Sequence, residues 1–190
     1  MHGKSEFGLF LQAQHRVKSP RRGEALQLLD SLSEQISQLE DRIRAQISLT
    51  ATMQLLKTVP GIGDMLAIVV EREVGTISRF FSPQRFSSYS GTTPRVSSSG
   101  GKTRYGKMRT ESNQYLKWAF IEAANVVAAH HAQSGWTNRH CSRLYVRVRA
   151  RKGSSVAIGA VARHLAESVY WVLKKNEPYK EPSKVSPRQE

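Results

Sequence analysis

The segment from Glu24 to about Thr52 contains no glycine or proline, and its apolar residues recur at helical spacing. Steps of three and four residues separate them, which is the repeat of a coiled coil. The repeat consists of Leu29, Leu32, Ile36, Leu39 and Ile43. An ordinary amphipathic helix packed on its own domain would show the same pattern over so short a stretch. We therefore expect a helix over residues 24–53, after a flexible lead-in over residues 1–23, and leave open whether it is a packed helix or a coil that forms homo-oligomers through Leu29–Ile43.

Further stretches with helical periodicity predict a mainly α fold. They cover residues 65–74, 114–132 and 157–173, and Asn113 is a suitable N-cap for the second of them. We assign residues 54–176 to one helical domain. The tail over residues 177–190 is rich in charged residues and proline and is predicted to be disordered.

The turn Val59-Pro60-Gly61-Ile62-Gly63 separates two apolar helical segments within residues 54–75, the pattern of a helix-hairpin-helix unit. Gly61 and Gly63 permit a close backbone approach and a positive φ. The amides at the start of the second helix could then face a DNA phosphate. A purely structural turn between two helices shows the same pattern, so both interpretations stand.

Residues 90–112 form a basic stretch rich in serine, threonine and glycine, which we predict to be a loop. Ser97, Ser98 and Ser99 are followed directly by Gly100 and Gly101. A hydroxyl beside glycines can be approached closely by a bulky substrate, and cations nearby can hold its phosphate. The cations are Arg95, Lys102, Arg104, Lys107 and Arg109. Plain surface loops have a similar composition, but the charge favours a nucleic-acid contact here.

The 190 residues carry 29 Lys and Arg against 15 Asp and Glu, a formal net charge of +14, which indicates a polyanionic partner. Arg143, Arg147 and Arg151 lie four residues apart, so on a helix they share one face that could follow a phosphate backbone; a solvated charged face is the alternative. A single cysteine, Cys141, excludes an internal disulfide, and no Cys or His cluster has metal-site spacing. No apolar run is long enough to span a bilayer, so we expect a cytoplasmic, nucleoid-associated protein with no membrane partner.

In this order the segments resemble the C-terminal half of the insertion-sequence one-ten family of transposases, also described as bridge-RNA-guided serine recombinases. The similarity spans roughly residues 31–179 and rests on four blocks. These are VPGIG from Val59 to Gly63, YSGTTPRVSSSGGKTRYGKM from Tyr89 to Met108, QYLKWAFIEAA from Gln114 to Ala124, and the stretch from Arg149 to Tyr179.

The resemblance implies DNA transposition or site-specific recombination, in which a serine attacks a phosphodiester and holds the broken end covalently. Ser99 matches the position of that nucleophile, and Ser98 and Ser97 lie directly before it, so the choice within the triplet stays open. The implied partners are DNA and a guide (bridge) RNA. Where family members usually carry lysine, a small residue and glycine before the long helix, this sequence reads Thr110-Glu111-Ser112-Asn113.

The resemblance also implies an N-terminal RuvC-like domain with four acidic ligands for Mg²⁺. The acids between residues 54 and 175 show no two-metal pattern, so we expect this chain to bind no Mg²⁺ by itself and to rely on a separate RuvC-like half. The missing two-metal pattern favours the hypothesis of a truncated or split transposase. A non-catalytic DNA- or RNA-binding assembly module, or an inactive remnant, is the alternative.

Overall fold

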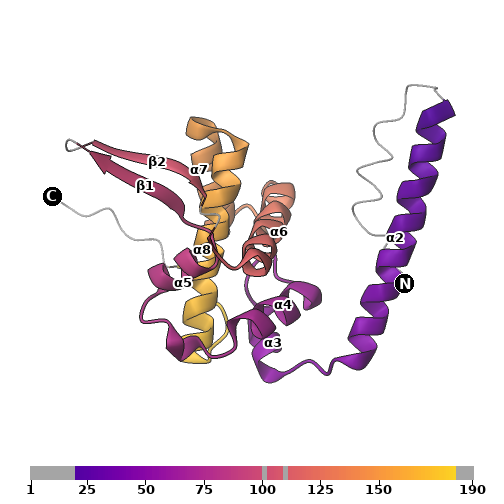
Figure 1. The fold of residues 1–190 in the computed structure, drawn as a ribbon, viewed down its shortest axis with the longest axis horizontal. Helices are drawn as coiled ribbons and strands as arrows, with labels where there is room; N and C mark the ends of the chain where they lie inside the picture. The colour runs from indigo at the N-terminus through magenta and orange to yellow at the C-terminus, as the bar shows by residue number, and fades with distance from the viewer. Residues whose placement is uncertain (1–19, 100–101, 109–110, 183–190) are drawn as a thin grey trace. The chain divides into compact units, whose positions relative to one another are not determined.

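The computed structural model describes residues 20–99, 102–108 and 111–182, with only the backbone described at 20–22, 95–99, 102–105 and 107–108. The predicted lead-in over residues 1–23 thus lies almost entirely outside the described part. The chain divides into two compact units, Met1–Ser48 and Leu49–Glu190, whereas the sequence suggested a boundary between residues 53 and 54. Most of the described residues are helical (Figure 1), which confirms the mainly α fold.

The first unit contains one described helix, α2 (Pro20–Gln46). Salt bridges from Arg44 to Glu40 and Asp41 lie on its surface. The helix was predicted to continue to residue 53, and this was wrong. It ends at Gln46, and α3 (Ala51–Leu56) starts afresh because Thr50 is extended and its side chain accepts a hydrogen bond from the Met53 amide at 3.0 Å, as an N-cap does.

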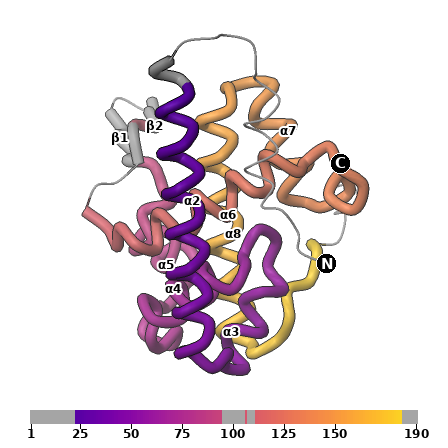
Figure 2. The backbone as a smooth tube through the Cα atoms, turned by 90° about the vertical axis from the view of Figure 1, so that its right-hand side faces the viewer, coloured from indigo at the N-terminus to yellow at the C-terminus, as the bar shows by residue number. Residues whose placement is uncertain are grey.

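The second unit is built around its last helix, α8 (Ser154–Lys175). In Figures 1 and 2 α8 runs beside α6 (Gln114–His130) and α7 (His140–Lys152), and α5 (Pro83–Tyr89) also packs against it. Leu165 and Val169 of α8 are fully buried. The ring of Phe86 in α5 lies 6.1 Å from that of Phe120 in α6 and 6.3 Å from that of Tyr170 in α8, measured between centroids. This cluster joins three helices into one core.

Helix α4 (Asp64–Val74) follows the predicted glycine-rich turn after α3, so two helices do flank Val59–Gly63. Gly61 has a φ of +83°, and a Cβ atom there would lie 2.3 Å from the carbonyl oxygen of Ala123 in α6. The turn therefore packs tightly on α6. Gly63 has a φ of −93° and no atom within 4 Å of the position of a Cβ atom.

A 3₁₀ turn, η1 (Ile77–Arg79), connects α4 to α5. Two antiparallel strands, β1 (Pro94–Ser99) and β2 (Lys102–Met108), follow α5. Residues 90–112 were predicted to form a loop. Most of this stretch instead forms a β-hairpin. The residues of β2 alternate between cations and residues that favour strands, Thr103 and Tyr105, and the two strand ends flank a Gly-Gly pair, which is a favoured composition for a short hairpin connection.

The chain after α8 packs back onto the second unit, although it was predicted to be disordered from residue 177. The Tyr179 amide donates to the Thr58 hydroxyl at 2.8 Å, and the Glu181 carboxylate accepts from the His140 amide at the start of α7, also at 2.8 Å. An anion at that end of α7 is favourable. Burial raises the pKa of the Tyr179 hydroxyl. The yellow end of the chain in Figure 2 therefore lies next to α3, and the predicted disorder from 183 onward falls outside the described residues.

None of the described helices is long and apolar enough to cross a membrane.

Replacing Gly61 with alanine is expected to lower the free energy of unfolding by about 2–4 kcal/mol, because alanine is strained at a positive φ and its Cβ atom would clash with the Ala123 carbonyl. Gly63→Ala is the matched control and should cost less than about 1 kcal/mol. Urea unfolding of both variants measures the difference. Equal losses would contradict the packing of Gly61 on α6.

The pKa of His164 in α8 is lowered to about 4, first by burial and then by the nearby His140, whose ring centroid lies 4.7 Å away. The unfolded chain takes up a proton near pH 6.5 and the folded chain resists it, so stability falls as the pH drops from about 6.5 to 4. The loss from this residue is about 3 kcal/mol. Urea unfolding across this range should show that His164→Leu removes this part of the pH dependence and that His131→Leu keeps it; an unchanged slope in His164→Leu would refute the assignment.

Candidate nucleic-acid interface

The hairpin register pairs the serine triplet with the cations of the second strand. Ser99 is opposite Lys102, Ser98 is opposite Thr103, and Ser97 is opposite Arg104. Paired positions share a face of a two-stranded ribbon, and the faces alternate along each strand. Positions 97, 99, 102 and 104 therefore share one face, and position 98 belongs to the other. The structure brings Ser99 and two of the predicted phosphate-binding cations together by register.

The other predicted cations of this stretch lie further from the serines. Arg95 is in β1 and Lys107 is in β2, and both lie within an irregular part of the ladder between the pairs Pro94–Met108 and Val96–Tyr105. There, two residues on β1 span the same distance as three on β2, so the alternation of faces shifts. Arg109 lies outside the described residues. The regular part of the ladder thus contains only Lys102 and Arg104 of the predicted cations.

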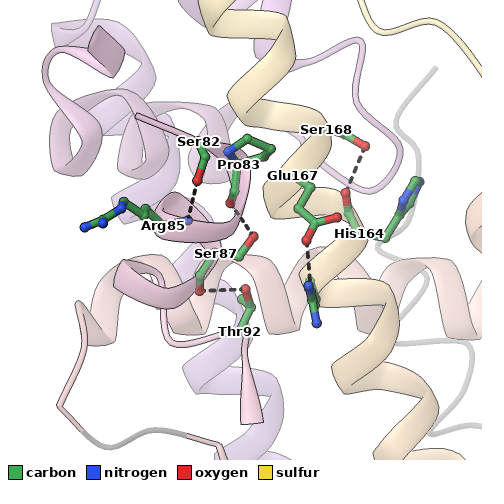
Figure 3. A network of polar contacts seen from close by, with 9 residues as sticks. Ser82, Pro83, Arg85, Ser87, Thr92, His164, Glu167 and Ser168 are labelled. Carbon is green, nitrogen blue, oxygen red and sulfur yellow. Dashed lines mark hydrogen bonds and ion pairs between the residues drawn. The ribbon is translucent and has the colours of Figure 1, made fainter. Parts of the chain in front are cut away.

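A chain of hydrogen bonds fixes the backbone between α5 and the start of β1 (Figure 3). The Thr92 hydroxyl donates to the Ser87 carbonyl at 3.0 Å, and the Ser87 hydroxyl donates to the Pro83 carbonyl at 2.8 Å. Thr92 is 1% exposed. Gly91 has a φ of +66°, and a Cβ atom there would lie 2.3 Å from the Ser112 hydroxyl oxygen. The start of the hairpin is therefore held against the chain that returns from it.

The returning chain is held by Asn113. Its backbone amide donates to the Tyr89 carbonyl at 2.9 Å, and its side-chain oxygen accepts from the Leu116 amide at 2.9 Å, which confirms the predicted N-cap of α6. Its side-chain nitrogen donates to the Glu73 carboxylate at 2.6 Å. The hydrogen bond from Asn113, together with Arg79, lowers the pKa of Tyr89. Asn113 thus fills a capping role at the place where the sequence departs from the family's usual lysine, small residue and glycine.

The glycine-rich turn was predicted as a second contact with DNA. Gly61 packs against α6, while Gly63 is exposed at the N-terminus of α4. A carboxylate, Asp64, occupies the first turn of α4 and pairs with the Lys57 ammonium at 2.6 Å. A negative charge there opposes a phosphate at the same helix end. The turn between two helices is present, and its contact with a phosphate backbone stays a prediction.

Helix α7 bears the third predicted contact. Arg143, Arg147 and Arg151 are exposed on it, and the helix contains no acidic residue. Arg143 also donates to the carbonyl of Asn138. The four-residue spacing places all three arginines along one helix face, as predicted.

The described residues contain no group of three His, Cys, Asp or Glu side chains that could hold a metal ion. The part of the chain that the structure describes therefore does not fit an Mg²⁺ site of the two-metal kind. The acidic residues near the interface have other contacts: Glu73 accepts from Asn113, and Glu71 accepts from the Thr50 hydroxyl at 2.5 Å.

The aromatic residues between positions 80 and 89 divide between the core and the surface. Phe80 and Phe86 are buried, but Phe81 is 89% exposed and Tyr89 is 37% exposed. Phe81 directly precedes Ser82, the N-cap of α5, and Pro83 at its first turn. The Ser-Pro pair marks a helix start, and this signal could have shown that Phe81 stands outside the helix.

Part of the chain is similar in sequence to known transposases. Residues 53–141, which include the hairpin and all of α6, match the sequence profile of the transposase IS116/IS110/IS902 family. The transposase for insertion sequence element IS1328 from Yersinia enterocolitica is 28% identical over 147 residues, covering 75% of this chain and 41% of that protein. The transposase for insertion sequence element IS1111A from Coxiella burnetii is 26% identical over 147 residues, covering 77% of this chain and 40% of that protein.

The chain spans about two fifths of the length of these curated relatives. The matched segment contains the serine triplet, the hairpin cations and Asn113. Over residues 53–141 the chain therefore matches a transposase domain of the IS116/IS110/IS902 family.

Proposed function

We propose that this chain acts in DNA transposition or site-specific recombination and that its β-hairpin contacts the DNA strand that is cut. One observation carries the proposal: the register places Ser99 opposite Lys102, on the same face as Arg104. A serine beside two cations is suited to a phosphodiester, because the cations offset the charge that develops on the phosphate oxygens. The match to insertion-sequence transposases supports the same activity.

In the proposed reaction the Ser99 hydroxyl oxygen attacks the phosphorus atom and its proton passes to a base. A serine–phosphate bond forms, the bond from phosphorus to the leaving strand's oxygen breaks, and that oxygen takes up a proton. One phosphoester bond replaces another, so the hydroxyl of a new strand can reverse the step without external energy. Ser97 shares the face of Ser99 and is the second candidate, and the position of Ser98 on the other face disfavours it.

A serine hydroxyl needs a base or a metal ion to become a good nucleophile. The described residues of this chain supply no acidic cluster for that task. We therefore propose that cleavage requires a separate RuvC-like half that binds Mg²⁺, and that a guide RNA is a further partner, as the resemblance implies. A DNA- or RNA-binding module without chemistry of its own is the alternative, which the same lack of acids favours.

The decisive experiment incubates the full chain with labelled DNA carrying the element's end junction, its flanking RNA and Mg²⁺, with and without an added RuvC-like half. A denaturing gel then detects covalent protein–DNA adducts. We expect an adduct that Ser99→Ala abolishes and that Ser98→Ala, the matched control, retains. If DNA binds in a salt-sensitive way but no adduct forms even with the added half, the chain is a binding module.

The arginine face of α7 is proposed as a second contact with the phosphate backbone. Arg147→Ala should weaken binding to duplex DNA and reduce the slope of log affinity against log salt by about 0.9, the value expected for one lost phosphate contact. Fluorescence anisotropy between low and moderate salt measures the slope. Arg163→Ala is the control, because the Arg163 guanidinium pairs with Glu167 at 2.9 Å on α8. A slope equal to that of the unmodified chain would show that the face is only solvated.

Helix α2 is proposed to form homo-oligomers with the same helix of a second copy. It leaves Leu28, Leu29, Leu32, Ile36 and Leu39 between 41% and 61% exposed, and four of these belong to the a/d repeat. Apolar residues at this spacing are stabilised when a partner helix covers them.

Analytical ultracentrifugation tests this contact. Replacing both Leu32 and Ile36 with glutamate should reduce the mass to that of a single chain, because the charges would be buried in the seam. Ser31→Glu with Gln38→Glu adds the same charge at outer positions and should leave the mass unchanged. A single-chain mass for the unmodified protein would exclude the coil.

A further inference from the structure

A shallow open groove lies between η1 and α5, next to the base of the hairpin. Its lining includes Arg79, Phe80, Phe81, Arg85, Tyr89 and Glu111. None of the contacts described for the proposed reaction uses it. The groove combines exposed aromatic surface with cations, which is the composition of surfaces that bind unpaired nucleotides.

Phe81 supplies most of the exposed aromatic surface of the groove. It is 89% exposed, the largest exposed fraction among the large apolar side chains described. The nearby Phe80 and Phe86 belong to the core instead. Their ring centroids lie 5.1 Å apart, and both side chains are buried. The core is therefore complete without Phe81, and the ring of Phe81 is open to a ligand.

Arg79 is held in place by two of the aromatic rings. Its guanidinium lies 4.6 Å from the centroid of Phe80 and 4.7 Å from that of Tyr89. Such stacking fixes the plane of the guanidinium while its hydrogen-bond donors stay available at the edge. The second cation, Arg85, is exposed, and its backbone amide is fixed by the cap from Ser82 at 3.3 Å. The groove thus presents two arginines from short, well-anchored segments.

The charged residues that line the groove indicate which kind of ligand binds there. Glu111 on the rim carries the opposite charge to Arg79 and Arg85, so a phosphate group over the whole groove would meet repulsion as well as attraction. A neutral aromatic base avoids this repulsion and can stack on Phe81, while the phosphates on either side of it reach the arginines. The chain's net charge of +14 favours a polyanion over an apolar protein segment.

The groove is also suitably placed for the strand that the hairpin binds. Tyr89 accepts a backbone hydrogen bond from Asn113 at 2.9 Å, so the groove lies where both ends of the hairpin enter the helices. From Pro94 to Ser99 the strand rises about 17 Å, at about 3.4 Å per residue. The groove and Ser99 are therefore separated by at least the length of β1, a distance that several nucleotides of one strand can span.

We propose that the groove binds one unpaired nucleobase of the DNA strand, stacked on Phe81, several nucleotides from the phosphodiester at Ser99, with Arg79 and Arg85 binding the adjacent phosphates. The proposal rests on the function proposed above and adds a second point at which the strand is held. It assigns the groove to single-stranded DNA flanking the cut.

Fluorescence anisotropy of the full chain tests the base contact with three probes of equal length: a single-stranded oligothymidylate, the same strand without bases, and a duplex. Phe81→Ala should weaken binding to the oligothymidylate about tenfold and leave the other two probes within about twofold, because only the first can stack an unpaired base. Phe81→Trp should restore the affinity. Trp171→Ala removes another half-exposed aromatic side chain, on α8, and is the matched control with no expected effect.

A second readout locates the base. In a series of oligonucleotides, each with a single 5-iodouracil at a different position, ultraviolet cross-linking to Phe81 should peak at one position, several nucleotides from the bond at Ser99. Equal loss of affinity for all three probes, or no loss for any, would overturn the assignment. A Phe81→Ala variant with a lower oligomeric mass would assign the surface to a protein contact instead, and a Phe81-dependent preference for the matching RNA strand would assign it to RNA.

The proposed function fails independently of this groove. The proposed function would fail if covalent adducts formed without Ser99. It would also fail if Lys102→Ala left the affinity for the base-free strand unchanged. Failure of the groove would leave both of those results intact and change only the Phe81 series.

Discussion

The second unit depends on the burial of one helix, α8, against the rest of the unit. Leu165, Val169 and Tyr170 of α8 are buried, and the Phe86 ring of α5 lies next to the rings of Phe120 in α6 and Tyr170 in α8. Burial of side chains of this size is worth about 1.5–3 kcal/mol each. This packing fixes α5 and α6, and those two helices hold the two ends of the hairpin. The position of the candidate site is thus a consequence of a core that contains none of its residues.

The hairpin has a firmly held base, and the residues of the proposed chemistry lie toward its other end. Thr92 and Asn113 satisfy backbone groups on the two sides of the base, and Gly91 allows the chains to approach each other closely. Strand pairing alone then places Ser99 opposite Lys102. Such an arrangement sets the order of the functional groups along the ribbon, whereas a flexible loop would not. Under the proposed function, this pairing is what would bring a serine and two cations to the same phosphodiester.

Periodicity predicted most of the helices, because apolar residues at helical spacing dominate α6 and α8, and the Asn113 cap was visible in the sequence. The break between α2 and α3 was missed because it contains no glycine or proline, and the start of α3 is marked by the side-chain cap of Thr50, a residue that fell inside the predicted helix. The hairpin was missed because its serines and glycines are also typical of loops. The return of Tyr179 to the fold depends on a contact between distant segments, which spacing along the chain does not encode.

The serine and cation face of the hairpin is the central claim, and its most direct test is to locate the covalent attachment by tandem mass spectrometry. The adduct is digested with nuclease and protease, and the peptide from Arg95 to Arg104 is searched for a nucleotide remnant. The register predicts the remnant on Ser99, on the same face as Lys102 and Arg104. A remnant on Ser98, on the opposite face, or on a residue outside the hairpin would contradict the account.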